Sequence, residues 1–200
     1  MIKIKDISEE EPYIFFLKLY DLASKQKQSS IDAAVISSYC DKYNVPDSRI
    51  VNIKYLIDKN LIFFSNYSSV KAGQFSSNNN IAMLFFWDKI NVQIRLRGSL
   101  EKCSNDFSDY HWNKRSQRKN ILSISSNQSK KIDSYEKVVE EYESLLKSNT
   151  KYFVRPSYWG GYSFCPQYFE FWEGHADRIN KRTCYESSKL GQWNKFFLQP

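Results

Sequence analysis

The 200-residue sequence predicts one domain of the mainly β class, an antiparallel barrel with several peripheral helices. Short apolar runs recur along the chain and are separated by turn-rich stretches. Residues 92–97 alternate apolar and polar side chains, as a strand with one solvent-facing side does. Helical patterns are confined to a few segments between these runs. With 42% hydrophobic and 16% aromatic residues, the chain can build one packed core.

The first expected element is an amphipathic helix within an N-terminal helical segment, residues 1–30. Ser8–Pro12 has the pattern of a capping box with proline in the first turn. Phe15 and Leu19 follow at helical spacing, so the helix should end before Lys25.

Strands are expected after this helix, because the apolar period changes. Tyr43–Asp47 forms a turn-rich stretch, and residues 68–75 predict a short helix. The expected strands are Ala33–Ser38, Ile50–Ile57, Leu61–Phe64, Ile81–Trp87 and Val92–Arg97.

A helical insertion is expected over residues 104–150. One helix should run from Ser104 to about Arg118 and another from Ser134 to about Lys147. Residues 120–131, rich in serine and asparagine, predict a mobile loop between them. The remaining expected strands are Tyr158–Phe164, Tyr168–Trp172, Arg182–Tyr185 and Trp193–Leu198.

The charge balance alone does not select a function. The chain has 29 basic and 22 acidic residues, a net charge of +7. This excess could attract nucleic acid, an anionic surface or a small phosphorylated ligand. No zinc-finger, RNP or convincing helix-turn-helix pattern accompanies it. We therefore expect a solvated basic surface and no nucleic-acid partner.

Other signals place the chain in the cytoplasm. No run of ~18 apolar residues is present, so no membrane association is expected. The first residues lack an apolar segment with a cleavage site, so we expect no signal peptide. The four cysteines lie far apart without metal-ligand spacing, which favours reduced thiols and no metal site.

Several local strings, in order along the chain, carry a resemblance to a known family. From about Ile31 to the C-terminus, the chain resembles the pyridoxamine/pyridoxine 5′-phosphate oxidase family. Each string is weakly specific by itself, but their shared order is strong evidence. The strings are Arg49–Lys54, Phe63–Asn66, Ser69–Ala72, Gln93, Gln128–Ser129, Trp159–Gly161, Glu170–Trp172, Arg178 with Arg182, Trp193 and Gln199–Pro200.

The resemblance implies a split β-barrel of Greek-key type that forms a homodimer, with FMN in each of two clefts between the subunits. A flavin phosphate carries about two negative charges and requires cationic, hydroxyl and amide donors. The cofactor-binding residues implied by the resemblance are Arg49, Phe64, Ser65, Lys71, Gln128 and Ser129 near the phosphate, Gln93, Trp172 and Arg182 near the flavin ring, and also Lys54.

The resemblance also implies residues that hold the substrate, a phosphorylated B6 vitamer or a similar planar molecule. Lys54 and the set His111, Arg115 and Lys119 would bind its phosphate, and the spacing of that set predicts one shared helix face. The implied catalytic residues are Arg178 and Asn180, which would also bind the substrate and orient it over the flavin.

The sequence departs from the family pattern at several of these positions. His111 replaces a tyrosine and Lys119 a serine, although both can still donate to a phosphate. Asn180 replaces a histidine at the substrate ring, and Val70 replaces an arginine of the flavin-phosphate loop. Losing one charged hydrogen bond costs ~1.5–3 kcal/mol, so FMN affinity should fall tenfold or more.

The function implied is an FMN-dependent oxidase that converts pyridoxamine or pyridoxine 5′-phosphate to pyridoxal 5′-phosphate, with dioxygen as acceptor and release of hydrogen peroxide. Two alternatives stay open. The chain could oxidise another ring, as dihydrophenazine oxidases of this architecture do, or it could bind FMN or pyridoxal phosphate without catalysis. Turnover with each substrate, or tight binding without peroxide release, separates them.

Overall fold

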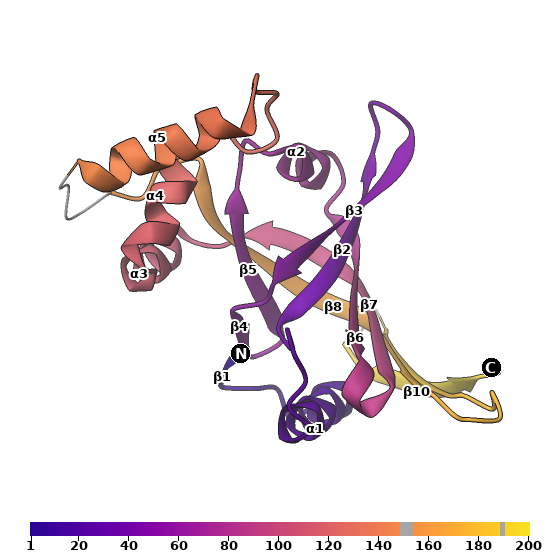
Figure 1. Ribbon diagram of the computed structural model, residues 1–200. Coiled ribbons are helices and arrows are strands. Elements are labelled where there is room, and N and C mark those ends of the chain that lie inside the picture. The colour runs from indigo at the N-terminus through magenta and orange to yellow at the C-terminus, as the bar shows by residue number, and fades with distance from the viewer. Residues whose placement is uncertain (149–153, 189–190) are drawn as a thin grey trace.

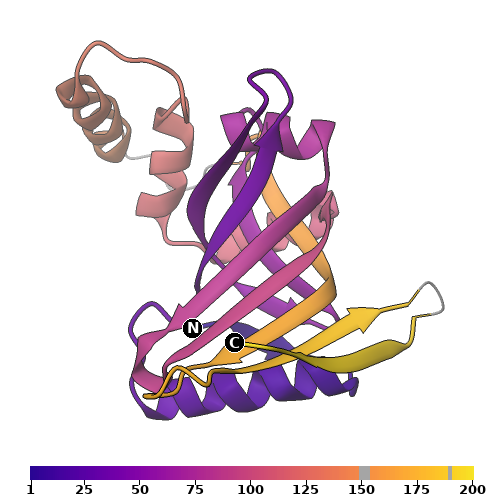
Figure 2. The same cartoon turned by 90° about the vertical axis from the view of Figure 1, so that its right-hand side faces the viewer.

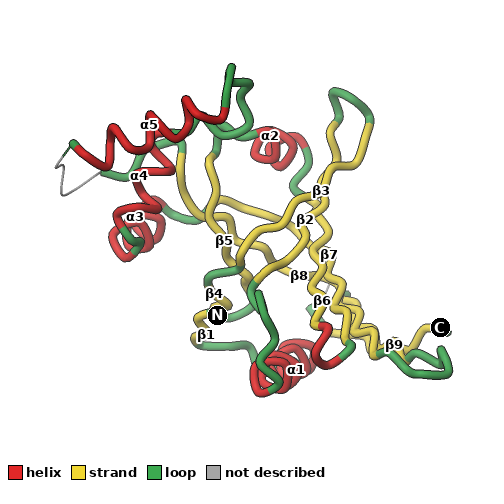
Figure 3. Tube along the Cα trace, in the orientation of Figure 1, coloured by secondary structure: helices red, strands yellow, loops and turns green. Residues whose placement is uncertain are grey.

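The computed structural model describes residues 1–148, 154–188 and 191–200 (Figure 1). In this part of the chain, ten strands form one curled sheet, and the helices lie at its periphery (Figure 3). The strand order is β1-β4-β5-β8-β7-β6-β2-β3, with β9 joined to β8 and β10 to β9. All described pairings are antiparallel except that of β1 with β4. The predicted fold, a mainly antiparallel barrel with peripheral helices, is confirmed.

The elements follow the chain in an order close to the predicted one. The strands are β1 (Lys3–Lys5), β2 (Ala33–Cys40), β3 (Val45–Asn52), β4 (Tyr55–Ile57), β5 (Asn60–Asn66), β6 (Asn80–Trp87), β7 (Val92–Lys102), β8 (Trp159–Glu173), β9 (Lys181–Ser187) and β10 (Trp193–Leu198). The α-helices are α1 (Glu11–Lys25), α2 (Val70–Ser77), α3 (Asn105–Lys114), α4 (Gln117–Ser125) and α5 (Tyr135–Lys147).

Helix α1 closes one end of the barrel (Figures 1 and 2). Its buried face inserts Phe16 against Phe85 and Trp87, with ring centroids 5.6 Å apart in both pairs. The predicted capping box does not form, because the helix begins at Glu11 and the hydroxyl of Ser8 accepts from the Glu10 amide instead. The predicted helical N-terminal segment also contains a strand, β1, which pairs with β4.

Strand β8 connects the barrel to the C-terminal hairpin. Its first half pairs with β5 and its second half with β9, while β7 lies along its other edge. The hairpin β9–β10 extends from the body of the barrel (Figure 2). Over β8 the sequence predicted two strands, Tyr158–Phe164 and Tyr168–Trp172. This division is wrong, because a β-bulge opposite Arg97 and Gly98 lets the pairing with β7 continue past Pro166. A Cβ at Gly98 would lie 2.1 Å from the Cys165 carbonyl oxygen, so glycine is required.

The turn of the hairpin β2–β3 lies earlier in the chain than the expected turn-rich stretch, Tyr43–Asp47. Residues 41–44 form it, and Asn44 adopts a left-handed conformation with φ 54°. Val45–Asn52 is a strand although it contains Pro46. Strand β3 is an edge strand, where proline's missing N–H is tolerated. The predicted strand Ile50–Ile57 is likewise divided, since β3 ends at Asn52 and β4 begins at Tyr55.

The helical insertion contains three helices instead of the two predicted ones. The expected helix from Ser104 to Arg118 breaks at Arg115, whose backbone is extended (ψ 151°). Ser116 then begins α4, which covers residues 117–125 and replaces half of the predicted mobile loop. Helix α5 confirms the second predicted helix. Residues 149 and 150 of the predicted insertion lie outside the described residues.

Candidate functional site

A cavity of about 500 Å³ lies between strands β3 and β5 and the helices α3 and α4. This volume lies in the range of small-molecule sites. Among the residues that the structure describes, its lining includes several cationic side chains and no carboxylate. The lining residues are Ile50, Val51, Asn52, Lys54, Phe64, Ser65, Lys71, His111, Lys114, Arg115, Ser116, Lys119, Gln128 and Trp159.

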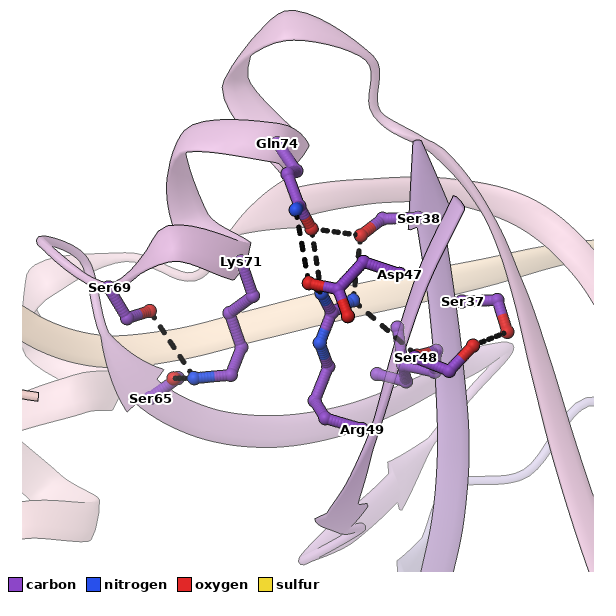
Figure 4. A network of polar contacts seen from close by, with 10 residues as sticks. Ser37, Ser38, Asp47, Ser48, Arg49, Ser65, Ser69, Lys71 and Gln74 are labelled. Carbon is purple, nitrogen blue, oxygen red and sulfur yellow. Dashed lines mark hydrogen bonds and ion pairs between the residues drawn. The ribbon is translucent and has the colours of Figure 1, made fainter. Parts of the chain in front are cut away.

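Lys71 lies in the first turn of α2 and points toward the end of β5 (Figure 4). Its Nζ donates to the hydroxyls of Ser65, at 3.1 Å, and Ser69, at 3.3 Å. Burial lowers the pKa of Lys71, and the nearby positive charge of Arg49 lowers it further. An anion between Lys71 and Arg49 would relieve this repulsion, so the site is suited to a phosphate.

Arg49 does not line the cavity but lies beside Lys71, within a polar network that joins β2, β3 and α2 (Figure 4). Its guanidinium donates to Ser38 Oγ at 2.7 Å, to Gln74 Oε1 at 2.7 Å and to Asp47 Oδ2 at 2.6 Å. The sequence identified Arg49 but not Asp47 or Gln74. Their only signal was polar character on an expected turn and helix.

Arg115 occupies the break between α3 and α4. Its Nη1 donates to the Lys119 carbonyl (3.2 Å), Asn120 Oδ1 (3.0 Å) and Ser123 Oγ (3.0 Å). The guanidinium also lies over the Trp159 ring, 4.5 Å from its centroid. Burial lowers the pKa of Arg115 to about 10, which still leaves it charged at neutral pH.

His111, Arg115 and Lys119 line the cavity together, but the predicted shared helix face is wrong. His111 belongs to α3, and Lys119 belongs to α4. Arg115 directly follows the last residue of α3, Lys114. The break in the chain therefore brings the three side chains to one wall by a bend instead of by helical periodicity.

His111 stacks on Phe64, with ring centroids 3.7 Å apart and an interplanar angle of 9°. Its Nδ1 lies 2.9 Å from the hydroxyl of Tyr55. Burial, together with the charges of Arg115 and other nearby cations, lowers the pKa of His111 to about 4. The imidazole is therefore neutral at pH 7. Sequence reasoning missed Tyr55, which carried only the signal of an aromatic residue in a strand.

Of the other predicted phosphate ligands, Lys54 and Gln128 line the cavity and Ser129 does not. Lys54 lines the cavity, and its Nζ donates to Asp32 Oδ2 at 3.0 Å. Gln128 lines both this cavity and an adjoining one of about 290 Å³. Ser129 is exposed, has φ 70° and does not line either of them.

A second group of predicted residues lies on β7, β8 and β9 and does not line the cavity. Gln93 is the register partner of Trp172, which in turn pairs with Arg182. The Glu170 carboxylate accepts from Arg182 Nη2 at 2.7 Å and also binds Arg95. Burial alone would raise the pKa of Glu170, but hydrogen bonds from both arginines hold it below its usual range.

The predicted catalytic residues lie in the turn between β8 and β9. Arg178 is exposed and has a left-handed backbone, φ 65°. The Asn180 side chain accepts a hydrogen bond from the His175 amide at 3.0 Å. Neither residue lines the cavity, so within this chain the predicted site is divided into two separate groups.

Two further findings concern the described residues alone. They contain no group of three or more His, Cys, Asp or Glu side chains placed to hold a metal ion. None of the helices within these ranges is long and apolar enough to cross a membrane.

Two family models match the chain. Residues 27–144 match the pyridoxamine 5′-phosphate oxidase family, and residues 159–200 match the pyridoxine 5′-phosphate oxidase C-terminal dimerisation region. A pyridoxine/pyridoxamine 5′-phosphate oxidase of Legionella pneumophila is 33% identical over 90% of this chain and 84% of its own length. One from Leptospira interrogans is 28% identical over all of this chain and 92% of its own.

Solved structures share the fold. PhzG from Burkholderia lata, in complex with tetrahydrophenazine-1-carboxylic acid, superposes with a TM-score of 0.89 at 23% identity, covering 95% of this chain and 93% of its own. A pyridoxamine 5′-phosphate oxidase-related, FMN-binding protein from Nostoc punctiforme gives 0.78 at 14% identity, covering 96% and 100%.

Proposed function

Since the chain belongs to the pyridoxamine 5′-phosphate oxidase family, we propose that it is an FMN-dependent oxidase of pyridoxamine or pyridoxine 5′-phosphate. One observation carries the proposal. The main cavity is lined by Lys54, Lys71, Arg115 and Lys119, without a carboxylate among its described residues, beside the aromatic rings of Phe64 and Trp159. Such a lining favours a planar ligand that bears phosphate.

For the FMN phosphate, the donors would be the side chains near the first turn of α2 and the loop after α4. Lys71 and Ser65 already share a hydrogen bond there, so a phosphate oxygen can join an existing polar cluster. Arg49 lies beside them, and Gln128 lines the same cavity. Ser129, the next residue after Gln128, would have to turn toward the phosphate, because it is exposed and does not line the cavity. The residues present therefore suit this cofactor despite Val70.

The flavin ring would meet Gln93, Trp172 and Arg182 of the partner subunit in a homodimer. Two observations support this arrangement. The second group of predicted residues does not line the cavity of its own chain. Trp172 and Arg182 also lie within residues 159–200, which match a family region described as a dimerisation region.

The substrate phosphate would bind to Lys54, Arg115 and Lys119, with neutral His111 as an additional donor. Arg178 and Asn180 of the partner would orient the substrate ring. FMN, when bound, supplies the acceptor for the substrate's hydride and returns the electrons to dioxygen, with release of hydrogen peroxide. The protein's part is to position the two ligands and neutralise their charge.

A second candidate substrate follows from the departures at His111, Lys119 and Asn180, which alter both ends of the substrate site. A dihydrophenazine is the alternative to assay, because a protein of the same fold was solved with a tetrahydrophenazine carboxylic acid. Binding of FMN or pyridoxal phosphate without turnover is the other alternative.

Oxygen consumption by FMN-loaded protein tests these alternatives. We expect saturable uptake with pyridoxine phosphate or pyridoxamine phosphate and slower uptake with a dihydrophenazine. Faster turnover of the dihydrophenazine would overturn the substrate assignment. FMN binding without oxygen uptake from any of these compounds would indicate a binding protein.

A further inference from the structure

The Asp47 carboxylate lies inside the cationic cluster that the proposed function assigns to the flavin phosphate. Arg49 Nη2 donates to Asp47 Oδ2 at 2.6 Å, and Gln74 Nε2 donates to the same oxygen at 3.2 Å. Figure 4 shows Asp47 and Gln74 closing around the end of the Arg49 side chain, with Lys71 on the adjacent turn of α2. A phosphate that approached Arg49 would therefore meet a carboxylate already bound to it.

Asp47 is charged under physiological conditions. The hydrogen bond from Gln74 lowers the pKa of Asp47, and the positive charge of Arg49 lowers it further. Arg49 and Lys71 supply two positive charges, and Asp47 removes one of them. A phosphate dianion would thus meet a cluster with a net charge near +1 and would compete with Asp47 for the guanidinium.

Asp47 is not needed to hold Arg49 in place. The guanidinium also donates to Ser38 Oγ and to Gln74 Oε1, both at 2.7 Å, and its side chain is only 16% exposed. The Asp47 side chain is 45% exposed, so it can rotate toward solvent when another anion takes its place. The geometry thus combines a fixed cation with a displaceable carboxylate.

We propose that Asp47 is an internal counter-ion of Arg49 that weakens the binding of phosphorylated flavin by competing with the cofactor's phosphate. This inference rests on the proposed function, which places the FMN phosphate at Arg49 and Lys71. It makes Asp47 a determinant of how strongly the site prefers FMN over riboflavin, which has the same ring without the phosphate.

The test compares FMN with riboflavin in binding titrations followed by flavin fluorescence. The variants are Asp47→Asn, which keeps the shape and removes the charge, and Asp47→Ala, which also removes the acceptor of the Arg49 hydrogen bond. Asp21→Asn is the matched control, because Asp21 lies on α1 and pairs with Lys25. Thermal unfolding without flavin establishes that the variants are folded.

We expect FMN affinity to rise about tenfold in Asp47→Asn and Asp47→Ala, since a charged competitor is removed. Riboflavin affinity should stay unchanged, and Asp21→Asn should bind both flavins as the original chain does. Unchanged or weaker FMN binding in the Asp47 variants would overturn the inference. If the original chain binds neither flavin, the proposed function itself fails, which is a different result.

Discussion

Replacing Arg115 with methionine should separate substrate binding from folding stability. Methionine keeps an unbranched apolar side chain at this position and removes the guanidinium, which lies over the Trp159 ring. A charge-assisted hydrogen bond contributes about 1.5–3 kcal/mol, so the affinity for a phosphorylated substrate should fall about 10- to 150-fold. FMN affinity should change little, because its proposed phosphate ligands lie near α2 and in the loop after α4 and do not include Arg115.

The effect of this substitution on stability can be worked from two opposing contributions. Because burial lowers the pKa of Arg115 to about 10, keeping the charge costs about 3 kcal/mol, which solvent screening at this partly exposed side chain reduces to about 1–2 kcal/mol. Removing the three hydrogen bonds of the guanidinium costs about 2–3 kcal/mol. The net loss should be near 1 kcal/mol, or about 2–4 °C in Tm.

Calorimetric titration with pyridoxal 5′-phosphate and thermal unfolding measure the two effects of the Arg115 substitution. Arg118→Met is the matched control, because Arg118 is exposed on α4 and does not line the cavity. Unchanged ligand affinity in Arg115→Met would refute the assignment to the substrate phosphate. A fall in Tm well beyond 10 °C would show that the residue is mainly structural.

Three further predictions concern residues around the two groups. Tyr55→Phe removes the hydrogen bond to His111 Nδ1 and should weaken substrate binding about threefold to tenfold, measured by titration, with little change in Tm. The pKa of His111 is about 4 in the folded chain and ~6.5 in the unfolded chain. Between these pH values the unfolded state binds more protons, so the contribution of His111 to stability falls as the pH drops from ~6.5 toward ~4. His111→Gln should make denaturant unfolding less pH-dependent across this window, and an unchanged profile would contradict the buried neutral imidazole. Glu170→Gln leaves Arg95 and Arg182 without their counter-charge and should lower the free energy of unfolding in urea by about 3 kcal/mol. A loss below about 1 kcal/mol would show that the carboxylate is dispensable.

Much of the fold could be predicted because the periodicities are local. The alternation in β7 and the apolar stripe of α5 are properties of short windows, and both elements form as expected. The continuity of β8 could not be predicted in this way. Its bulge depends on the close approach of Gly98 to the Cys165 carbonyl, and these residues are brought together only by the pairing of β7 with β8.

The candidate site was predictable only in its residue types. The resemblance identified Lys71, Arg115 and Gln128, which line one cavity. It could not reveal Gln74 beside Arg49, because that contact requires the position of α2 against β3. Asp47 was missed because it was assigned to an expected turn, whereas it lies two residues from Arg49 on the same strand. The helix break at Arg115 was also hidden, since the sequence around it keeps a helical charge spacing while Ser116 begins a new helix.

In the proposed homodimer, each flavin cleft combines the cavity of one subunit with Gln93, Trp172 and Arg182 of the partner subunit. Mixed dimers test it most directly, with Lys71→Glu in one subunit, Trp172→Ala in the other, and different affinity tags for purification. Each variant alone should bind FMN weakly at both sites. The mixed dimer should recover one cleft of original affinity, because one of its two clefts contains neither substitution. If the mixed dimer binds FMN as weakly as its parents at both sites, each cleft is built from a single chain and the account is contradicted.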